Sequence, residues 1–271
     1  MVILPPGSSG AEPHRFRLLA EGFGGDPERY HRARPDCPQA LVDQIVAASP
    51  GREVLDVGIG TGIAAQAFQA AGCTVLGVDP DERMAEYARR RGLQVEVARF
   101  EEWEPAGRTF DAVIAGQTWH WLDPGAGAAK AALVLQPGGR LAVFWNAMEL
   151  PSDVGEALAD AFRRVVPGAP AARAPTGGPA GYQAFYAKAP DGIRDARAFS
   201  EPERWQVDWE RAYTRDEWLE AMATGGGFNR LERSQLDALL ADAGAVIDAI
   251  GGSVTVKYAT VAVTALSLCT S

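Results

Sequence analysis

Strand-like runs of apolar residues alternate with helix-like runs between residues 41 and 146. The strand-like runs are short and are separated from the helices by glycine, proline or aspartate: Glu53–Val57, Cys73–Val78, Leu93–Ala98, Phe110–Gly116 and Arg140–Trp145. A connection between parallel strands needs a dozen or more residues and is nearly always right-handed. The alternation therefore predicts a parallel sheet with helices on both of its faces.

The second half of the chain has a different pattern. Residues 152–166 and 230–250 have the apolar spacing of amphipathic helices, and Thr214 with Glu217 has the pattern of a capping box at a further helix start. Residues 167–200 are rich in Ala, Pro and Gly, and we expect an irregular excursion there. Two further strand patterns complete the predicted sheet: Glu203–Tyr213 and Val254–Leu268.

No internal repeat or clear linker divides the chain, so we expect one domain with an inserted cap. Residues 1–14 are rich in Pro, Gly and Ser, which predicts a flexible leader. We expect residues 15–271 to form the single domain. The cap elements are predicted at about residues 15–40 and 150–230.

Charge and cysteine content exclude several classes of partner. The 271 residues include 26 basic and 35 acidic residues, a net charge of −9, whereas a nucleic-acid or anionic-membrane binder needs a basic surface. The three cysteines are too scattered for a disulfide framework or a zinc site, so we expect no metal and a reducing, cytoplasmic location. Lys257 interrupts the longest apolar stretch, and the first residues lack the basic start of a secretory signal.

A glycine-rich turn follows the first predicted strand. Its glycines stand at positions 58, 60 and 62, whereas a dinucleotide-binding fingerprint would need glycine at Ile63. No Lys-Ser/Thr pair follows, so the turn is not a phosphate-binding loop. Such glycines allow positive φ and close approach of a ligand to the backbone. Asp56 at the strand end would repel a pyrophosphate and suits a ligand that carries an ammonium group.

Asp79 ends the second predicted strand, 23 residues after Asp56. At this edge of a doubly wound sheet, a carboxylate can accept two hydrogen bonds from the hydroxyls of a bound ribose. Asp79-Pro80 alone is also typical of a helix N-cap and turn. Together with the glycine turn, it favours a nucleoside ligand.

Four segments resemble the class I S-adenosylmethionine-dependent methyltransferases: LDVGIGTG (55–62), GVDPDERM (77–84), FDAVIAGQTWHW (110–121) and LQPGGRLAVFWN (135–146). Within that class, Tyr30-x-x-x-Arg34-Pro35 and Gln117-x-x-His120-Trp121 resemble the branch of trans-aconitate methyltransferases, which act on small molecules. The resemblance implies an α/β fold with a Rossmann-like, doubly wound seven-stranded sheet, mostly parallel with its last strand antiparallel. It also implies S-adenosyl-L-methionine as cofactor and S-adenosyl-L-homocysteine as product.

The resemblance also assigns cofactor-binding residues. It implies that Asp79 holds the ribose and that Gln117 lies near the reacting sulfonium. The methionine portion would be surrounded by Asp56, Gly58, Gly60 and Gly62, and the adenine by Pro80, Met84, Phe100 and Glu101. Ile59 is bulkier than the cysteine or alanine of many members, which slightly tightens the turn.

Five further residues are candidates for catalysis or substrate binding. His120 follows the fourth strand and suits a general base, although it could equally only shape the pocket. Arg34 could pair with the cofactor carboxylate or a substrate acid, or lie at the surface. We expect Tyr30, Trp121 and Asn146 at the substrate, with core packing or strand termination as the structural alternatives.

These observations favour an enzyme that transfers a methyl group from S-adenosylmethionine to a small molecule, at a carboxylate or hydroxyl oxygen. A carboxylate acceptor would need an arginine to hold it, and a phenol would need His120 as base. A nicotinamide-dependent dehydrogenase is the first alternative, and a catalytically inactive S-adenosylmethionine-binding protein is the second. We expect no nucleic-acid or membrane partner and a monomer or homodimer.

Overall fold

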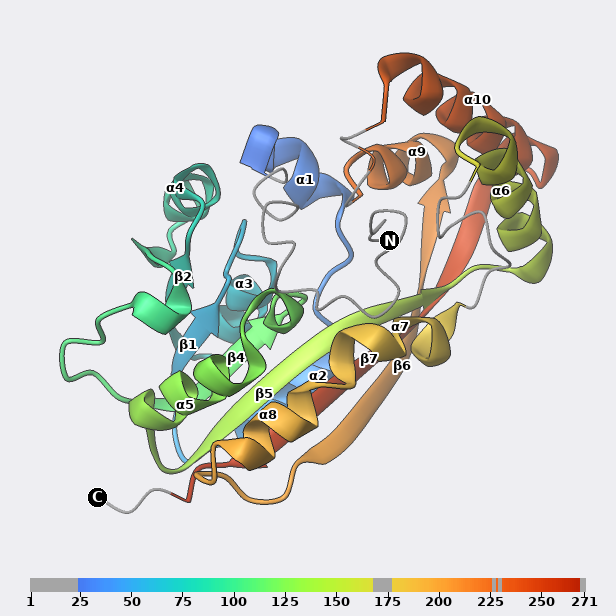
Figure 1. Ribbon diagram of the computed structural model, residues 1–271. Coiled ribbons are helices and arrows are strands. Elements are labelled where there is room, and N and C mark those ends of the chain that lie inside the picture. Colours follow the sequence, from blue (N-terminus) through green and yellow to red (C-terminus); the bar gives the residue numbers. More distant parts are fainter. Residues whose placement is uncertain (1–23, 168–176, 226–227, 229–230, 269–271) are drawn as a thin grey trace. The chain divides into compact units, whose positions relative to one another are not determined.

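The computed structural model describes residues 24–167, 177–225, 228 and 231–268 (Figure 1). The leader predicted for residues 1–14 lies outside these ranges. One sheet has the strand order β3-β2-β1-β4-β5-β7-β6. Its strands are β1 (Glu53–Val57), β2 (Thr74–Asp79), β3 (Gln94–Val97), β4 (Phe110–Gly116), β5 (Leu135–Glu149), β6 (Glu203–Thr214) and β7 (Ser253–Leu266).

The first five strands are parallel. β1 pairs with β2 and β4, β2 pairs with β3, and β4 pairs with β5. β7 runs antiparallel to β5, because Ser267 and the Gly138–Gly139 pair exchange backbone hydrogen bonds of 2.8 and 3.0 Å. The predicted Rossmann-like fold with seven strands, mostly parallel, is therefore confirmed.

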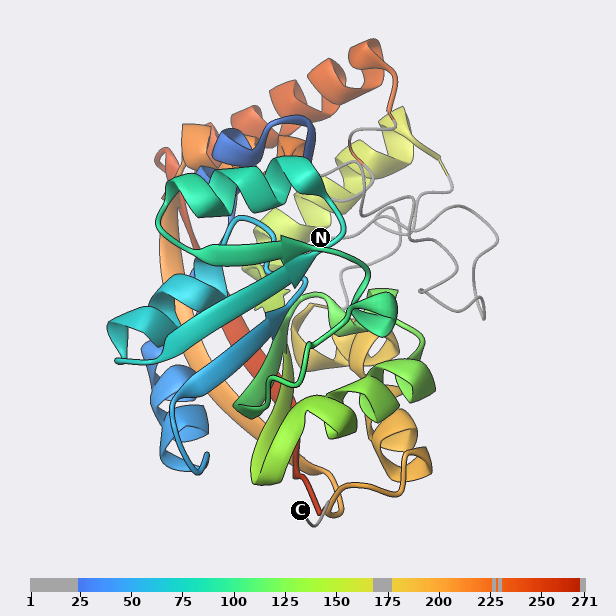
Figure 2. The same ribbon diagram turned by 90° about the vertical axis from the view of Figure 1, so that its left-hand side faces the viewer.

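The helices are α1 (Pro27–Ala33), α2 (Gln39–Ala47), α3 (Ile63–Ala70), α4 (Glu82–Arg90), α5 (Pro124–Val134), α6 (Ser152–Val165), α7 (Gly178–Tyr186), α8 (Ala189–Asp195), α9 (Arg215–Ala223) and α10 (Arg233–Ala249). Two single turns, η2 (Phe100–Glu102) and η3 (Trp119–Trp121), follow β3 and β4. Figure 2 shows α2 and α3 on one side of the parallel strands and α5 and α8 on the other. The sheet is thus wound on both faces, as the sequence predicts.

Two elements differ from the prediction. Residues 178–195, expected to be irregular, contain α7 and α8. In α8, proline stands in the first turn, where it is tolerated, and Ala189 and Ile193 are buried. β5 begins at Leu135, so Pro137 and the following glycines lie within the strand rather than before it. A register shift in the pairing with β4 accommodates them.

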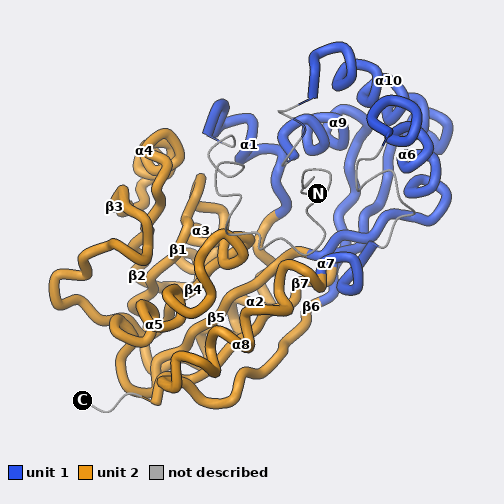
Figure 3. Tube along the Cα trace, in the orientation of Figure 1, with its two compact units in different colours: residues 1–35, 147–182, 208–258 blue, residues 36–146, 183–207, 259–271 orange. Residues whose placement is uncertain are grey.

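The chain divides into two compact units, coloured in Figure 3. Unit 1 comprises residues 1–35, 147–182 and 208–258, and unit 2 comprises residues 36–146, 183–207 and 259–271. Strands β5, β6 and β7 contribute residues to both. The core of unit 2 joins β1, β2 and β4 to α2 and α3, through residues such as Leu41, Phe68 and Ile114.

The core of unit 1 is built around α6, α9 and α10. Phe162 meets Phe228 edge to face, with ring centroids 5.8 Å apart, and Trp218 meets Tyr213 at 5.7 Å. α9 begins with the predicted capping box, in which Thr214 and Glu217 satisfy each other's backbone N–H groups. Among the described residues, no helix combines the length and the apolar character needed to cross a bilayer.

Candidate functional site

The glycine turn lies where the strand order reverses in unit 2. β1 and β4 are neighbours, and the chain leads away from them in opposite directions through β2 and through β5. Ligands of open α/β sheets bind at the carboxyl ends of the strands beside such a switch point. Gly58, Gly60 and Gly62 have φ of +68°, +55° and +86°, and Gly62 is the N-cap of α3. The turn therefore has the backbone geometry predicted from its glycines.

The three glycines differ in how much space a side chain would have at each position. A Cβ on Gly58 would lie 2.1 Å from Cγ2 of Thr118, and a Cβ on Gly62 would lie 2.1 Å from Cδ1 of Leu93. A Cβ on Gly60 would meet nothing closer than the carbonyl oxygen of Gly58, at 4.0 Å. Gly58 and Gly62 are thus packed by the protein, whereas Gly60 leaves its backbone open to a ligand.

Thr118, which the sequence did not single out, ties the β4 end to this turn. Its hydroxyl lies 3.2 Å from the carbonyl oxygen of Gly58 and 3.1 Å from that of Gly116. Its neighbour Gln117 has φ of +60°, and its backbone N–H donates to Phe144 at 2.8 Å. A non-glycine residue in the left-handed region is strained, and such residues cluster at functional sites.

Asp79 is buried at the end of β2, beside the turn. Its Oδ2 accepts the backbone N–H of Gly60, and its Oδ1 that of Asp81, both at 2.8 Å. Burial raises the pKa of Asp79 to about 6, although these two hydrogen bonds act in the opposite direction. Each carboxylate oxygen retains a lone pair that could accept a ligand hydroxyl.

Asp56 lies deeper, at the end of β1, and only 1% of it is exposed. The backbone N–H of Ala65 is its hydrogen-bond donor, and Oδ2 is buried without a partner. Burial, followed by the charge of Asp79, raises the pKa of Asp56 to about 8. At neutral pH the isolated side chain therefore keeps its proton, and a cationic N–H group beside Oδ2 would favour the carboxylate form and satisfy that oxygen.

The remaining cofactor residues predicted in unit 2 occupy different environments. Met84 on α4 and Phe100 on η2 are buried, whereas Pro80 and Gln117 are exposed. Glu101 is half-buried, and its Oε1 lies 3.4 Å from the backbone N–H of Asp123. These positions follow β2, β3 and β4 at the carboxyl ends of the strands.

His120 is buried in η3 among aromatic side chains. Trp145 donates its Nε1–H to Nδ1 of His120 at 3.0 Å. The rings of Trp121 and Phe185 lie 4.5 and 4.9 Å from that of His120, the latter edge-on. Nε2 is buried without a partner, and burial lowers the pKa of His120 to about 3.

This geometry fixes the tautomer of His120. Because Nδ1 accepts a hydrogen bond, the neutral ring carries its proton on Nε2. The atom left without a partner is then a donor, and the atom that could accept a proton is already engaged. The structure therefore favours a hydrogen-bond donor over the catalytic base predicted from the sequence.

Asn146 and Trp145 also differ from simple expectation. Asn146 Oδ1 accepts the hydroxyl of Thr260 at 2.8 Å, and Nδ2 donates to the carbonyl of Asp36 at 3.4 Å. Asn146 lies within β5 rather than at its end, so the strand-terminating alternative is wrong. Both ends of its amide are engaged inside unit 2, and its substrate-binding role stays a prediction. Trp145, which lies within β5, orients His120, and nothing in the sequence pattern signals this hydrogen bond.

Tyr30 and Arg34 belong to unit 1, whereas the glycine turn belongs to unit 2. The Arg34 guanidinium lies over the Tyr30 ring, 4.6 Å from its centroid. Arg34 Nη2 donates to the backbone carbonyl of Thr224 and, at 3.2 Å, to the Thr224 hydroxyl. The cofactor role predicted for Arg34 stays a prediction.

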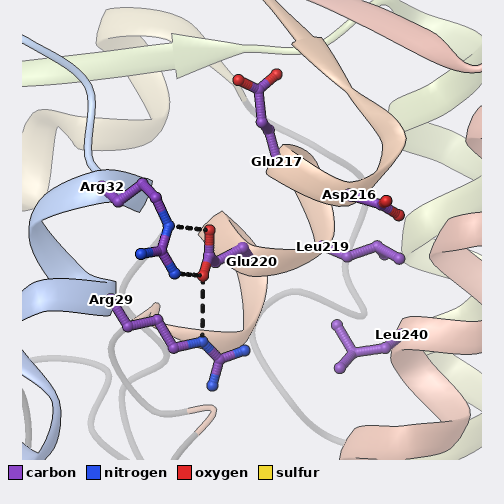
Figure 4. Close-up of a pocket in the computed structure, with 7 residues that line it drawn as sticks. All are labelled: Arg29, Arg32, Asp216, Glu217, Leu219, Glu220 and Leu240. Carbon is purple, nitrogen blue, oxygen red and sulfur yellow. Dashed lines mark hydrogen bonds and ion pairs between the residues drawn. The ribbon is translucent and has the colours of Figure 1, made fainter.

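A cavity of about 480 Å³ in unit 1 lies between α1 and α9 (Figure 4). Arg32 donates to both oxygens of Glu220, and Arg29 Nε lies 3.6 Å from the same carboxylate. Both arginines thus share the carboxylate of Glu220, which joins α1 to α9. Within the described ranges, no group of three or more His, Cys, Asp or Glu residues could hold a metal ion.

Comparisons with known proteins indicate the family of the segment that contains the glycine turn. Residues 55–143 match the family described as "Methyltransferase domain". An uncharacterized methyltransferase of Mycobacterium tuberculosis (strain ATCC 25618 / H37Rv) is 37% identical over 133 residues, 48% of this chain and 54% of that protein. A ubiquinone biosynthesis O-methyltransferase of Bordetella avium is 32% identical over 139 residues, 48% of this chain and 58% of that protein. The chain thus spans about half the length of these relatives.

A solved structure supports the same fold. A protein assigned as a type II methyltransferase from Anaeromyxobacter dehalogenans superimposes with a TM-score of 0.60 and 22% identity. The match covers 85% of this chain and 97% of that one. At this identity the likeness concerns the fold.

Proposed function

We propose that the chain is a class I S-adenosylmethionine-dependent methyltransferase that transfers the cofactor's methyl group to a small-molecule acceptor. The methyltransferase-domain match over residues 55–143 and the fold support this proposal. The observation that carries the proposal is the pair of buried carboxylates beside an open glycine turn. Asp56 keeps an oxygen without a donor, Asp79 has lone pairs to spare, and Gly60 leaves room for a ligand. These features fit a ligand with both an ammonium group and a ribose.

The predicted cofactor-binding residues of unit 2 have separate roles in this proposal. Asp79 accepts hydrogen bonds from the ribose hydroxyls, and Asp56 Oδ2 accepts one from the ammonium group. The backbone of the Gly58–Gly62 turn lets the amino-acid portion approach closely. When bound, the cofactor supplies a methyl group on a positively charged sulfur. Holding donor and acceptor in line supplies about 7–11 kcal/mol of the barrier reduction.

We assign His120 a hydrogen-bonding role. Its Nε2–H donates to an oxygen of the acceptor and holds that acceptor in line, while Trp145 keeps the ring in the required tautomer. Trp121 and Phe185, which pack on the His120 ring, exclude water from the hydrogen bond between His120 and the acceptor. A donor of this kind suits an acceptor that reacts as a carboxylate or enolate oxygen, which needs no base. Methylation at oxygen is therefore part of the proposal.

The names of the relatives support a small acceptor. They include a ubiquinone biosynthesis O-methyltransferase and a demethylmenaquinone methyltransferase of Corynebacterium kroppenstedtii. The narrower resemblance to trans-aconitate methyltransferases stays a prediction. A nicotinamide-dependent dehydrogenase is disfavoured by Ile63, which begins α3 at the position where the fingerprint needs glycine.

The experiment begins with binding. The full chain is titrated calorimetrically with S-adenosylhomocysteine and, separately, with NADH. We expect Asp79→Asn to weaken S-adenosylhomocysteine binding about 10- to 100-fold, because a charge-assisted hydrogen bond contributes about 1.5–3 kcal/mol. Asp195→Asn, the same chemical change at an exposed position of unit 2, serves as the control. Binding of NADH without S-adenosylhomocysteine would reverse the assignment.

Methyl transfer is tested next. The protein is incubated with isotopically labelled S-adenosylmethionine and a small-metabolite extract of its host, and mass spectrometry identifies any compound that gains the label. A labelled small molecule supports the proposal. Cofactor binding with no labelled product would favour the catalytically inactive binder.

A further inference from the structure

Two arginines of unit 1 stand apart from the others. Every other arginine that the structure describes in this unit forms an ion pair with a carboxylate: Arg29, Arg32, Arg163, Arg164, Arg215 and Arg233. Arg34, which follows α1, and Arg211, in β6, form none among the described residues. In an acidic chain with a net charge of −9, two half-buried guanidinium groups without a carboxylate need an explanation.

The two arginines are adjacent. Arg211 Nη1 donates to the backbone carbonyl of Arg34 at 3.1 Å. Each guanidinium lies over a tyrosine ring, Arg34 over Tyr30 at 4.6 Å and Arg211 over Tyr213 at 4.5 Å. Arg34 Nη2 is bound by Thr224, but its Nε–H is buried and has no acceptor. A buried donor without an acceptor is costly, so this N–H favours an oxygen ligand to which it can donate a hydrogen bond.

Tyrosine hydroxyls extend the cluster. The hydroxyls of Tyr213 and Tyr258 are buried and 2.7 Å apart, and Trp209 stacks on Tyr258 at 4.5 Å and 15°. Burial raises the pKa of both Tyr182 and Tyr258. The positive charge of Arg34 opposes this rise at Tyr182, and that of Arg211 opposes it at Tyr258. Positive charge and hydroxyl donors are therefore collected on an aromatic surface.

Glu217 interacts electrostatically with Arg211 but forms no ion pair with it. Hydrogen bonds from the backbone N–H and hydroxyl of Thr214 lower its pKa first, and the charge of Arg211 contributes last. Those two bonds, of 2.8 and 2.9 Å, commit the carboxylate to the capping box of α9. Arg34 and Arg211 therefore have no carboxylate at ion-pair distance among the described residues, and their guanidinium groups are available to an acid.

We propose that Arg34 and Arg211, with the hydroxyl groups beside them, form a binding site for a carboxylate attached to an apolar body. This proposal goes beyond the proposed function and concerns unit 1 alone, because it gives that unit a binding site for an organic acid. Guanidinium groups match the planar carboxylate in geometry as well as charge. The half-buried aromatic rings of Tyr30 and Trp209 suit the apolar body of such an acid.

The probes are benzoate, benzamide and inorganic phosphate, titrated into the full chain with ligand-observed NMR as the readout. Benzamide has the shape of benzoate without its charge. We expect benzoate to bind at least ten times more tightly than benzamide. Phosphate that binds more tightly than benzoate, and loses this binding in Arg211→Gln, would overturn the carboxylate assignment.

Variants locate the site. We expect Arg34→Gln and Arg211→Gln each to weaken benzoate binding at least tenfold, while Arg233→Gln, an exposed arginine of the same unit, leaves it unchanged. Should Arg211→Gln fail to fold, Arg211→Lys replaces it; it keeps the charge without the planar fork and is expected to lose at least threefold. Benzoate affinity that stays equal in folded variants of both arginines overturns the proposal.

Titration with S-adenosylhomocysteine separates this proposal from the proposed function. If that ligand binds the wild type but benzoate does not, the acid site is wrong and the methyltransferase assignment stands. If that ligand does not bind the wild type at all, the proposed function fails, whatever benzoate does.

Discussion

The contact between Gly58 and Thr118 offers the sharpest test of how the cofactor turn is built. In Gly58→Ala, the added Cβ would lie 2.1 Å from Cγ2, 2.6 Å from Oγ1 and 2.8 Å from Cβ of Thr118. The threonine cannot easily move away, because its β-branched side chain is stiff and its hydroxyl is bonded to both strand ends. The backbone at Gly58 also has φ of +68°.

Two contributions set how much Gly58→Ala lowers the free energy of unfolding. A side chain in the left-handed region costs about 1–2 kcal/mol, and forcing extra atoms into a packed site costs about 1–3 kcal/mol. Gly107→Ala isolates the first term, because Gly107 has φ of +78° and a Cβ there would meet nothing within 4 Å. We therefore expect Gly58→Ala to lower the free energy of unfolding by about 1–3 kcal/mol more than Gly107→Ala does.

Urea denaturation of both variants measures this difference. Adding Thr118→Ala to Gly58→Ala removes the two closest atoms, and we expect it to restore part of the loss. A loss in Gly58→Ala that matches the loss in Gly107→Ala, with no rescue, would refute the argument that packing against Thr118 requires glycine here.

Three further predictions follow from the buried polar groups and the helix caps. First, the pKa of Asp56 is about 8 in the folded state and about 4 in the unfolded state, so the unfolded chain binds fewer protons in between. The stability that this group contributes is complete below pH 4 and is lost as the pH rises to 8, by up to about 1.4 kcal/mol per pH unit. Asp56→Asn should therefore reduce the change of the urea unfolding midpoint between pH 5 and 8. The same pH dependence in the variant and the wild type would contradict the pKa assigned to Asp56. Second, once an acceptor is known, kcat/KM should show no ionisation of His120 near pH 6.5, because its pKa is about 3; His120→Gln, which keeps an N–H donor, should retain more activity than His120→Phe, and a base-type limb near pH 6.5 that both variants abolish would restore the catalytic-base role. Third, Thr214→Ala removes the N-cap of α9 and should cost about 0.5–2 kcal/mol, measured as a lower midpoint of urea unfolding; Thr255→Ala, outside any cap, is the control, and equal losses would argue against the capping box.

Local signals in the sequence determined the frame of the fold and the cofactor side of the site. β1 and β4 have the predicted bounds, since a short apolar run bordered by turn residues is fixed by its own composition. The same holds for the glycine turn, because only glycine adopts its backbone angles at little cost. Asp79 could be placed beside the turn because parallel strands end at one edge of a sheet.

Tertiary packing decided the rest. α8 forms in a segment rich in breakers because its buried residues pack in unit 2, a contact that no local pattern encodes. His120 is a donor because Trp145, 25 residues away in the sequence, engages its other nitrogen. Arg211 likewise lies beside Arg34, 177 residues away in the sequence, because the fold brings the two segments together. Hydrogen bonds between distant segments depend on how the strands are ordered in space, so a sequence can supply the side chains but not the partners that set their chemistry.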